Sequence, residues 1–341
     1  MATIETRANW GAGFIAGFGA RALEAENQAD MAYSLASAGA LGIEAVEATR
    51  LLKKRTTQQG RETIVAKTGV GKGTITPEGS DFATDSREST YQTQLNPIKI
   101  TDSVEMTLEA RNDVERNIAD VMDAVFDMRV GWMQTRNEHS FSPFNYGFTA
   151  QASLPDQISY YADGVPLFST LHPIAATTTS NTTQSNASST GIVFSESNLE
   201  TGRLALLNQK DDKDLLQKYG AGRLILLIPP DLEKNAVIVT KSAKRSGTAN
   251  NDLNIYDGIV TCISTKWVGA NATGGSATAW FLIDSMFSPF IELEREGYTP
   301  STWVRNSNKN LVYDYYSRYC FGHKNFRGSW GSKGDAAAYS S

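Results

Sequence analysis

An apolar stripe along one predicted helix constrains the fold of this chain more than any other feature. From Asp113 onwards, apolar residues recur at alternating spacings of four and three, at Val114, Ile118, Val121, Val125, Met128 and Trp132. This period predicts one amphipathic helix over about residues 113–137, with Asn112 or Asp113 as its N-cap. Such a helix spans about 37 Å, given its rise per residue. Few compact domains need a rod of that length.

The segment before this helix is rich in β-forming residues but has little to bury. Residues 61–95 read RETIVAKTGVGKGTITPEGSDFATDSRESTYQTQL. We expect an extended β-hairpin with a glycine-rich tip. Because a two-stranded hairpin alone is marginally stable, it must lie on other structure. Another copy of the same chain is the simplest partner.

The GVGKGT core of this hairpin also resembles a phosphate-binding loop. Such a loop needs two glycines that bracket four residues, followed by Lys and then Ser or Thr. Here Ala66 occupies the position of the first glycine, and Gly73 separates Lys72 from Thr74. A phosphate loop also leads into a helix, whereas TITPEGSDFATDS has no helical period. The sequence therefore favours a flexible hairpin over a nucleotide site.

The remainder of the chain predicts a mixed α+β fold. Ser197 and Glu200 form a capping-box pattern that opens a helix through Leu207, and Pro229-Pro230 separates a buried strand at 223–228 from a helix that starts at Asp231. Further strands are expected at 258–265, 279–284, 290–296 and 312–322. The last strand carries Tyr313, Tyr315, Tyr319 and Phe321 on one face. The order of elements is too irregular for a Rossmann or barrel fold.

Two further features concern loops and termini. Residues 175–190, AATTTSNTTQSNASST, are of low complexity and predict a surface loop with almost nothing to bury. The N-terminus lacks the pattern of a signal peptide, and no apolar run reaches membrane-spanning length. We therefore expect a protein made in the cytoplasm, with no membrane partner.

Composition indicates a folded protein and argues against catalysis. Of the 341 residues, 40% are hydrophobic, and the net charge of -5 offers no general attraction for nucleic acid. Cys262 and Cys320 are too far apart to predict a zinc site or a disulfide framework. The three histidines are widely separated, and HExxH, CxxC and GxSxG motifs are absent. We expect no enzyme, no cofactor and no metal, and we expect His172, which precedes Pro173, to hydrogen-bond a loop.

The downstream half resembles a known family. The segments D163GVPLFSTLHP, S195ESNLE, L226LIPPDLEKNAVIVTKSA, N254IYDGI, A279WFLID and R318YCFGHKNFRG are similar in order and wording to Mu-like major head proteins, which are tailed-bacteriophage capsid proteins of the Hong Kong 97 type. The family motif residues are Phe168, His172, Pro173, Pro229, Pro230 and Asp231. The resemblance covers about residues 160–330, and residues 175–190 and 210–222 depart from the family pattern.

The resemblance implies a domain organisation. An N-terminal arm would occupy residues 1–55 and an extended hairpin, the E-loop, residues 56–98. The P-domain would occupy 99–160, with the long helix as its spine, and an outer α/β A-domain 161–289. Residues 290–341 would return to the P-domain and end the chain.

The resemblance also implies a function, that of a major capsid protein which self-assembles into the icosahedral head of a tailed phage. The partners would be other copies in hexamers and pentamers, portal and scaffolding proteins, decoration proteins, and packaged DNA through weak non-specific contact. The location would be the virion, after assembly in the bacterial host cytoplasm. Two alternatives stay open, an encapsulin-like nanocompartment shell of the same fold and a nucleotide-binding enzyme.

The candidate contact residues of the predicted E-loop are glycines and charged residues. Glycines at the tip let the loop conform to neighbours in different positions, and exposed ion pairs between subunits contribute at most about 1 kcal/mol each. The candidates are Arg61, Lys67, Gly69, Gly71, Lys72, Gly73, Glu78, Asp81 and Asp85.

Overall fold

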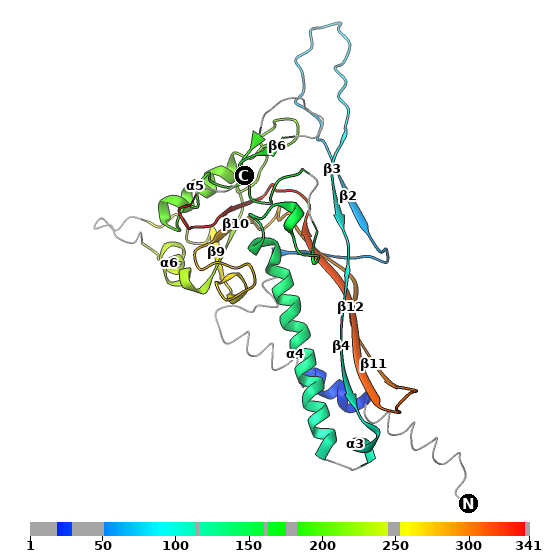
Figure 1. Cartoon of the computed structure of the whole chain (residues 1–341). Helices are drawn as coiled ribbons and strands as arrows, with labels where there is room; N and C mark the ends of the chain where they lie inside the picture. The colour runs from blue at the N-terminus through cyan, green and yellow to red at the C-terminus, as the bar shows by residue number, and fades with distance from the viewer. Residues whose placement is uncertain are drawn as a thin grey trace, which may run out of the picture.

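The computed structural model describes residues 19–28, 51–112, 116–159, 163–174, 183–244 and 253–337 (Figure 1). A long helix and long strands run side by side down the lower part of the molecule, and a compact α/β part lies at their upper end. A thin hairpin loop extends upward, away from both. The predicted arm falls largely in residues outside the described ranges.

Helix α4 (Arg116–Asn145) is the long rod, preceded by the short α3 (Leu108–Asn112). It ends beyond the predicted Asn137 and contains Pro143 near its C-terminus. Val125, Met128 and Trp132 are buried, which confirms this part of the predicted stripe. Of the two predicted caps, Asn112 is the last residue of α3, and Asp113 lies outside the described residues, as do the side chains of Val114, Ile118 and Val121.

The α4 stripe packs against one face of a long sheet. The sheet order is β1 (Lys53–Thr56), β11 (Phe290–Val304), β12 (Leu311–His323) and β4 (Ile98–Met106), and β5 (Ile158–Ser159) also pairs with β12. Strand β12 is antiparallel to both β11 and β4. The predicted face of β12 is confirmed, because the four aromatic residues assigned to it, Tyr313, Tyr315, Tyr319 and Phe321, are all buried. Residues 19–28 are helical and contribute Ala22 and Ala25 to the same core.

Strand β11 extends well past its predicted end at residue 296. It stays paired with β12 up to Val304, with bulges between Glu294 and Thr299. Pro300 lies in the part of β11 that, among the described residues, pairs with β12 alone, because β1 pairs only with Ile291–Glu294, and such an edge tolerates proline. The expectation of a short strand was therefore wrong.

The compact upper part is built on a second sheet of four strands. Its order is β13 (Ser329–Ser332), β10 (Trp280–Asp284), β8 (Leu224–Ile228) and β9 (Val260–Ser264). Every residue of β8 and β10 is buried, as expected for strands covered on both faces. One face packs on the end of α4, and the other on α5 (Glu196–Leu207) and α6 (Pro230–Lys241). The short 3₁₀ helices η1 (Gln151–Ser153) and η2 (Lys266–Val268) complete this region.

The start of α5 differs from the predicted capping box. Ser195, not Ser197, is the N-cap, and its side chain accepts a hydrogen bond from the Asn198 backbone N–H. Glu200 therefore lies beyond the position that a capping box needs. It pairs with Arg203 at 2.8 Å and accepts a hydrogen bond from the Tyr256 hydroxyl at 3.0 Å. The helix itself ends at Leu207, as predicted.

The Ser/Thr-rich tract is not a simple surface loop where it is described. Residues 175–182 lie outside the described ranges, but Thr183–Gln184 forms β7, which pairs with β6 (His172–Pro173). Asn186 is fully buried and Ala187 is nearly so. The expectation that the whole tract has almost nothing to bury was therefore wrong for its second half.

Cys262 and Cys320 are not joined by a disulfide in the structure. Cys320 is buried beneath the hairpin, and burial raises its pKa to about 11. Cys262 is half-buried on β9.

Candidate functional site

The most exposed feature of the molecule is the hairpin of β2 (Glu62–Lys67) and β3 (Ser89–Leu95). The two strands form the antiparallel hairpin that the sequence predicted, and Ile64 lies opposite Thr93. Thr68 closes the ladder, because its N–H donates to the Glu88 carbonyl at 2.8 Å and its hydroxyl accepts from the Glu88 N–H at 2.8 Å. Residues 69–87 therefore form a loop beyond the last backbone pair.

The root of the hairpin is held firmly by the body of the protein. Leu95 is fully buried and packs with Ile291, Leu293 and Cys320 of the long sheet. The Thr93 hydroxyl donates to the Lys324 carbonyl at 3.1 Å. Arg61, one of the predicted contact residues, donates to the Asn96 side chain at 3.0 Å. A rigid root under a long loop fixes the direction in which the loop projects (Figure 1).

The loop carries large apolar side chains in open solvent. Ile75 is 99% exposed and Phe82 is 93% exposed, and Val70 is more than half exposed. Such side chains next to glycines and charged residues have no packing role within this chain. Exposed apolar clusters of this kind mark surfaces that other molecules cover.

The predicted charged residues of the loop behave in two ways. Asp85 accepts hydrogen bonds from the Gly71 N–H and from the Lys213 ammonium, the latter at 3.2 Å. The hydrogen bond from Gly71, and then that from Lys213, lowers the pKa of Asp85. Lys67, Lys72, Glu78 and Asp81 are exposed, and among the described residues none of them forms an ion pair. Asp85 therefore fastens the side of the loop to its own chain, while the other charges stay available to a partner.

The GVGKGT segment does not have the geometry of a phosphate loop. Residues 70–88 contain no helix, so no helix N-terminus faces Gly71, Lys72 or Gly73. The loop backbone is extended or turned, with positive φ only at Gly79 (80°) among its glycines. Gly69 instead lies against the Asp211 carboxylate.

The motif around His172 is buried and fully hydrogen-bonded. Its Nδ1 lies 2.6 Å from Asp163 Oδ2, and its Nε2 lies 3.1 Å from the Leu167 carbonyl and 3.2 Å from Asn186 Oδ1. The ring stacks on Phe326 at 3.9 Å between centroids. The prediction that His172 holds a loop is confirmed. With both ring nitrogens in use, this residue is not arranged as a catalytic base.

The other motif residues also serve the fold. Phe168 is buried between Phe148 and Phe281, and its ring leaves no room for a side chain at Gly147 or Gly331. Pro229 and Pro230 form the N-cap and first position of α6, and Asp231 is an acidic residue in its first turn. Pro173 lies in β6. These residues position elements of the compact part, although Pro230 and Asp231 are exposed at the start of α6.

Sequence reasoning missed several residues that the geometry brings forward. Ile75 and Phe82 were not among the loop candidates, although each is a single large apolar residue in a polar, glycine-rich stretch. Lys213 was missed because it follows Asp85 by more than a hundred residues. Asp163 and Asn186 were missed because only the fold brings them to His172.

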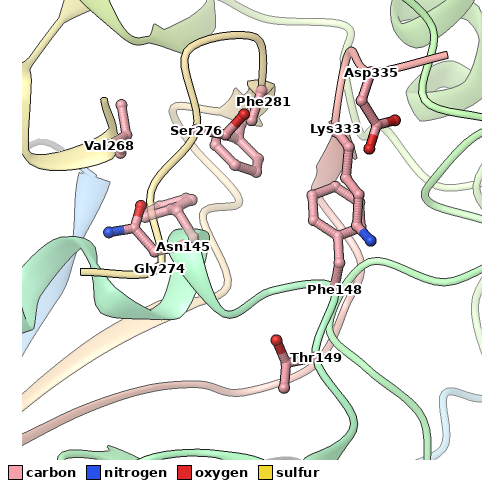
Figure 2. A pocket seen from close by; sticks show the side chains of 11 residues that line it. Asn145, Phe148, Thr149, Val268, Gly274, Ser276, Phe281, Lys333 and Asp335 are labelled. Atoms are coloured by element: carbon pink, nitrogen blue, oxygen red, sulfur yellow. The ribbon is translucent and has the colours of Figure 1, made fainter. Parts of the chain in front are cut away.

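A small pocket lies between the end of α4 and the loop after β9 (Figure 2). It is lined by Phe148, Phe281 and Lys333 among others, and the Lys333 ammonium lies 5.7 Å from the centre of the Phe148 ring. Its volume of about 230 Å³ is below the size of typical ligand sites. Among the described residues, no group of His, Cys, Asp or Glu is arranged to hold a metal ion. In the same ranges, no helix is both long and apolar enough to cross a bilayer.

Comparisons with known proteins agree with this architecture. Residues 163–330, just under half of the chain, match a family model described as phage capsid protein. The structure is similar to that of Mycobacterium phage Patience, with a TM-score of 0.52 at 12% identity, over 92% of this chain and 89% of the other. The fold is that of a phage capsid protein.

Two further similarities concern assembled particles. The mature capsid of bacteriophage PhiM1 matches this phage capsid fold with a TM-score of 0.50 at 12% identity, over 84% of this chain and 86% of the other. A virus-like particle from Pyrococcus furiosus is more weakly similar, with a TM-score of 0.46 at 8% identity, over 92% of this chain and 97% of the other. Comparison with curated protein sequences found no match.

Proposed function

We propose that this protein is the major capsid protein of a tailed phage, and that its β2–β3 loop joins neighbouring copies in the shell. One observation carries the second part of the proposal. A loop on a rigid root presents Ile75 and Phe82 almost completely to solvent in a capsid-type fold. Burial of two such side chains in a neighbour contributes about 1.5–3 kcal/mol each, several times an exposed ion pair.

The domain roles follow the same proposal. The hairpin within residues 56–98 acts as the E-loop, α4 with the long sheet as the P-domain, and the compact part as the A-domain of a Hong Kong 97-type subunit. The segments within residues 160–330 that resemble Mu-like major head proteins support the choice of a Mu-like type. A long helix on a long sheet supplies stiffness across a thin shell, and an extended loop supplies reach.

The proposed partners are other copies of the chain in hexamers and pentamers. Portal, scaffolding and decoration proteins complete the head, which is assembled in the bacterial cytoplasm. The net charge of -5 suits a container whose inner surface holds packaged DNA only weakly. Lys67, Lys72, Glu78 and Asp81 add exposed ion pairs that set the register of the loop on its neighbour.

The decisive experiment shortens the loop without disturbing its root. Replacing residues 69–87 by Asn-Gly joins Thr68 to Glu88 through a two-residue turn, which suits a hairpin. We expect a folded monomer by circular dichroism, because the loop buries almost nothing in its own chain. We expect no shells by electron microscopy and sedimentation, because each lost contact is repeated over the whole shell.

The wild-type protein is the reference for the first part of the proposal. Closed shells that contain nucleic acid support the phage capsid, whereas shells that contain protein cargo support the nanocompartment alternative. Normal shells from the shortened variant would refute the role of the loop and leave the capsid function standing. ATP binding that depends on Lys72 would support the nucleotide-binding alternative instead.

A further inference from the structure

A second exposed apolar surface lies on the compact part, far from the β2–β3 loop. It is an open groove of about 600 Å³ between α5 and residues 253–256. Its apolar residues are Leu204, Leu253 and Ile255, which are 46%, 83% and 58% exposed. Three large aliphatic side chains exposed together in a stable domain indicate a surface that a partner covers.

One wall of the groove is acidic and rigid. Glu196 and Glu200 of α5 line it. Glu200 accepts hydrogen bonds from Arg203 and from the hydroxyl of Tyr256. Tyr256 is buried and forms part of the groove floor. Asp257 follows the floor and is exposed. With Arg203 included, these four side chains carry a net negative charge.

The outer face of α6 has the complementary pattern. Ala236 and Thr240 face the core, so positions on the opposite side of the helix face solvent. There Lys234, Ile238 and Lys241 follow one another at spacings of four and three, and all three are exposed. Asp231 lies at the start of the same face and Lys244 just beyond its end. The outer face of α6 therefore presents one aliphatic side chain, Ile238, between Lys234 and Lys241.

We propose that the α5 groove of one copy receives the outer face of α6 from the next copy. Ile238 would enter between Leu204 and Leu253, and the lysines would meet the acidic wall. The two surfaces differ, so the contact is heterologous and repeats head to tail, which closes a ring when the rotation permits. This inference rests on the proposed shell function and adds a contact between the compact parts that does not involve the loop.

The second copy is favoured over other occupants by charge and by shape. Both surfaces occur on every subunit, and their charges are opposite. A single helix face in a groove of this size is too small for a stable dimer, which needs well over 1,000 Å². An interface of this size suits a contact that is weak between two subunits but is repeated around a ring of subunits.

Cross-linking tests which surfaces meet. Two kinds of subunit are made, both with Cys262→Ser. One carries Leu253→Cys and a long tag, and the other carries Ile238→Cys and a short tag. The two are assembled together under mild oxidation. We expect disulfides between long and short chains only. Disulfides between two long chains would show a symmetric groove-to-groove contact, and an absence of any disulfide in assembled shells would show that neither surface is buried. Either result overturns the proposal.

Charge reversal supplies an independent test with a matched control. Glu196→Lys and Lys241→Glu are each expected to weaken association by roughly five-fold per contact, and their combination to restore it. Lys218→Glu, an exposed reversal elsewhere on the compact part, should leave assembly unchanged. If the variant that combines Glu196→Lys with Lys241→Glu does not recover the association of the wild type, the proposed contact between Glu196 and Lys241 is refuted. If wild-type protein forms no shells at all, the proposed function fails instead.

Discussion

Asn186 and His172 lie 3.2 Å apart, from amide Oδ1 to imidazole Nε2, although Asn186 belongs to a tract with the composition of a solvent-exposed loop. The same oxygen accepts from the Ser169 N–H at 2.9 Å, and the amide nitrogen donates to the Leu167 carbonyl at 2.7 Å. One buried side chain therefore ties the end of the tract to the loop that precedes β6. Its removal takes away the acceptor of the Ser169 N–H and one of the two partners of both the Leu167 carbonyl and the His172 Nε2.

We predict that Asn186→Ala lowers the free energy of unfolding by about 1–3 kcal/mol, the cost of unsatisfied buried polar groups. Asn271→Ala is the matched control, because Asn271 is exposed and its loss should cost less than about 0.5 kcal/mol. Urea unfolding of the assembly-deficient monomer with the shortened loop measures both. Equal effects of the two substitutions would contradict the role of Asn186.

A second prediction concerns the ion pairs between α4 and β11. Arg136 contacts Glu292 and lies 2.6 Å from Glu294, and the Glu292 side chain is only 6% exposed. Arg136→Ala leaves this carboxylate buried without its cation, at a cost of about 3–5 kcal/mol. Arg305→Ala breaks the more exposed pair with Glu105 and should cost less than about 1 kcal/mol. Chemical denaturation measures the free energy of unfolding of both variants. Equal losses in the two variants would contradict the prediction that the more buried ion pair contributes more.

The third prediction is a pH dependence of stability. Burial lowers the pKa of His323 to about 4, with Asp163 opposing and His172 adding to the shift. The unfolded chain, with a histidine pKa near 6.5, binds a proton between these two values that the folded state does not bind. Stability from this group is therefore complete above about pH 6.5 and is lost as the pH falls toward about 4, by about 3 kcal/mol in total.

His323→Gln isolates this effect, because glutamine does not titrate. The difference in unfolding free energy between wild type and variant should shrink as the pH falls from 7 to 5. His139, whose pKa burial also lowers, is present in both proteins and cancels in the comparison. A difference that is constant with pH would refute the prediction.

Local patterns in the sequence predicted the elements that depend on local physics. The spacing of Val125, Met128 and Trp132 predicted the rod, and the Pro-Pro step predicted the start of α6. The histidine before Pro173 was correctly predicted to hold a loop. In each case the signal itself is local, although the partners of His172, which are Asp163 and Asn186, lie further away along the chain.

Contacts between distant segments were not predictable from these patterns. The composition of the tract around Asn186 suggested a dispensable surface loop. A single buried residue hardly changes the average polarity of such a tract, so composition could not reveal it. The strand predicted over 290–296 continues as β11 to Val304, because its pairing with the distant strand β12 extends that far. In the loop, the sequence analysis chose charged residues and glycines as the contact candidates. The exposed fractions of Ile75 and Phe82 make these two apolar residues the stronger candidates.

The last prediction compares those two kinds of side chain in the loop at constant length. Ile75→Ser with Phe82→Ser removes the apolar surface and keeps the reach, so folding should be unchanged because neither residue is buried in its own chain. Shell yield at a given protein concentration should fall nearly as strongly as in the shortened variant, since about 1.5–3 kcal/mol is lost per side chain and per contact. Lys72→Ala removes one exposed charge, worth at most about 1 kcal/mol, and should raise the concentration needed for assembly only about five-fold. Sedimentation across a concentration series separates the outcomes. If Lys72→Ala impairs assembly more than the double serine variant, charge and not apolar burial holds the loop on its neighbour.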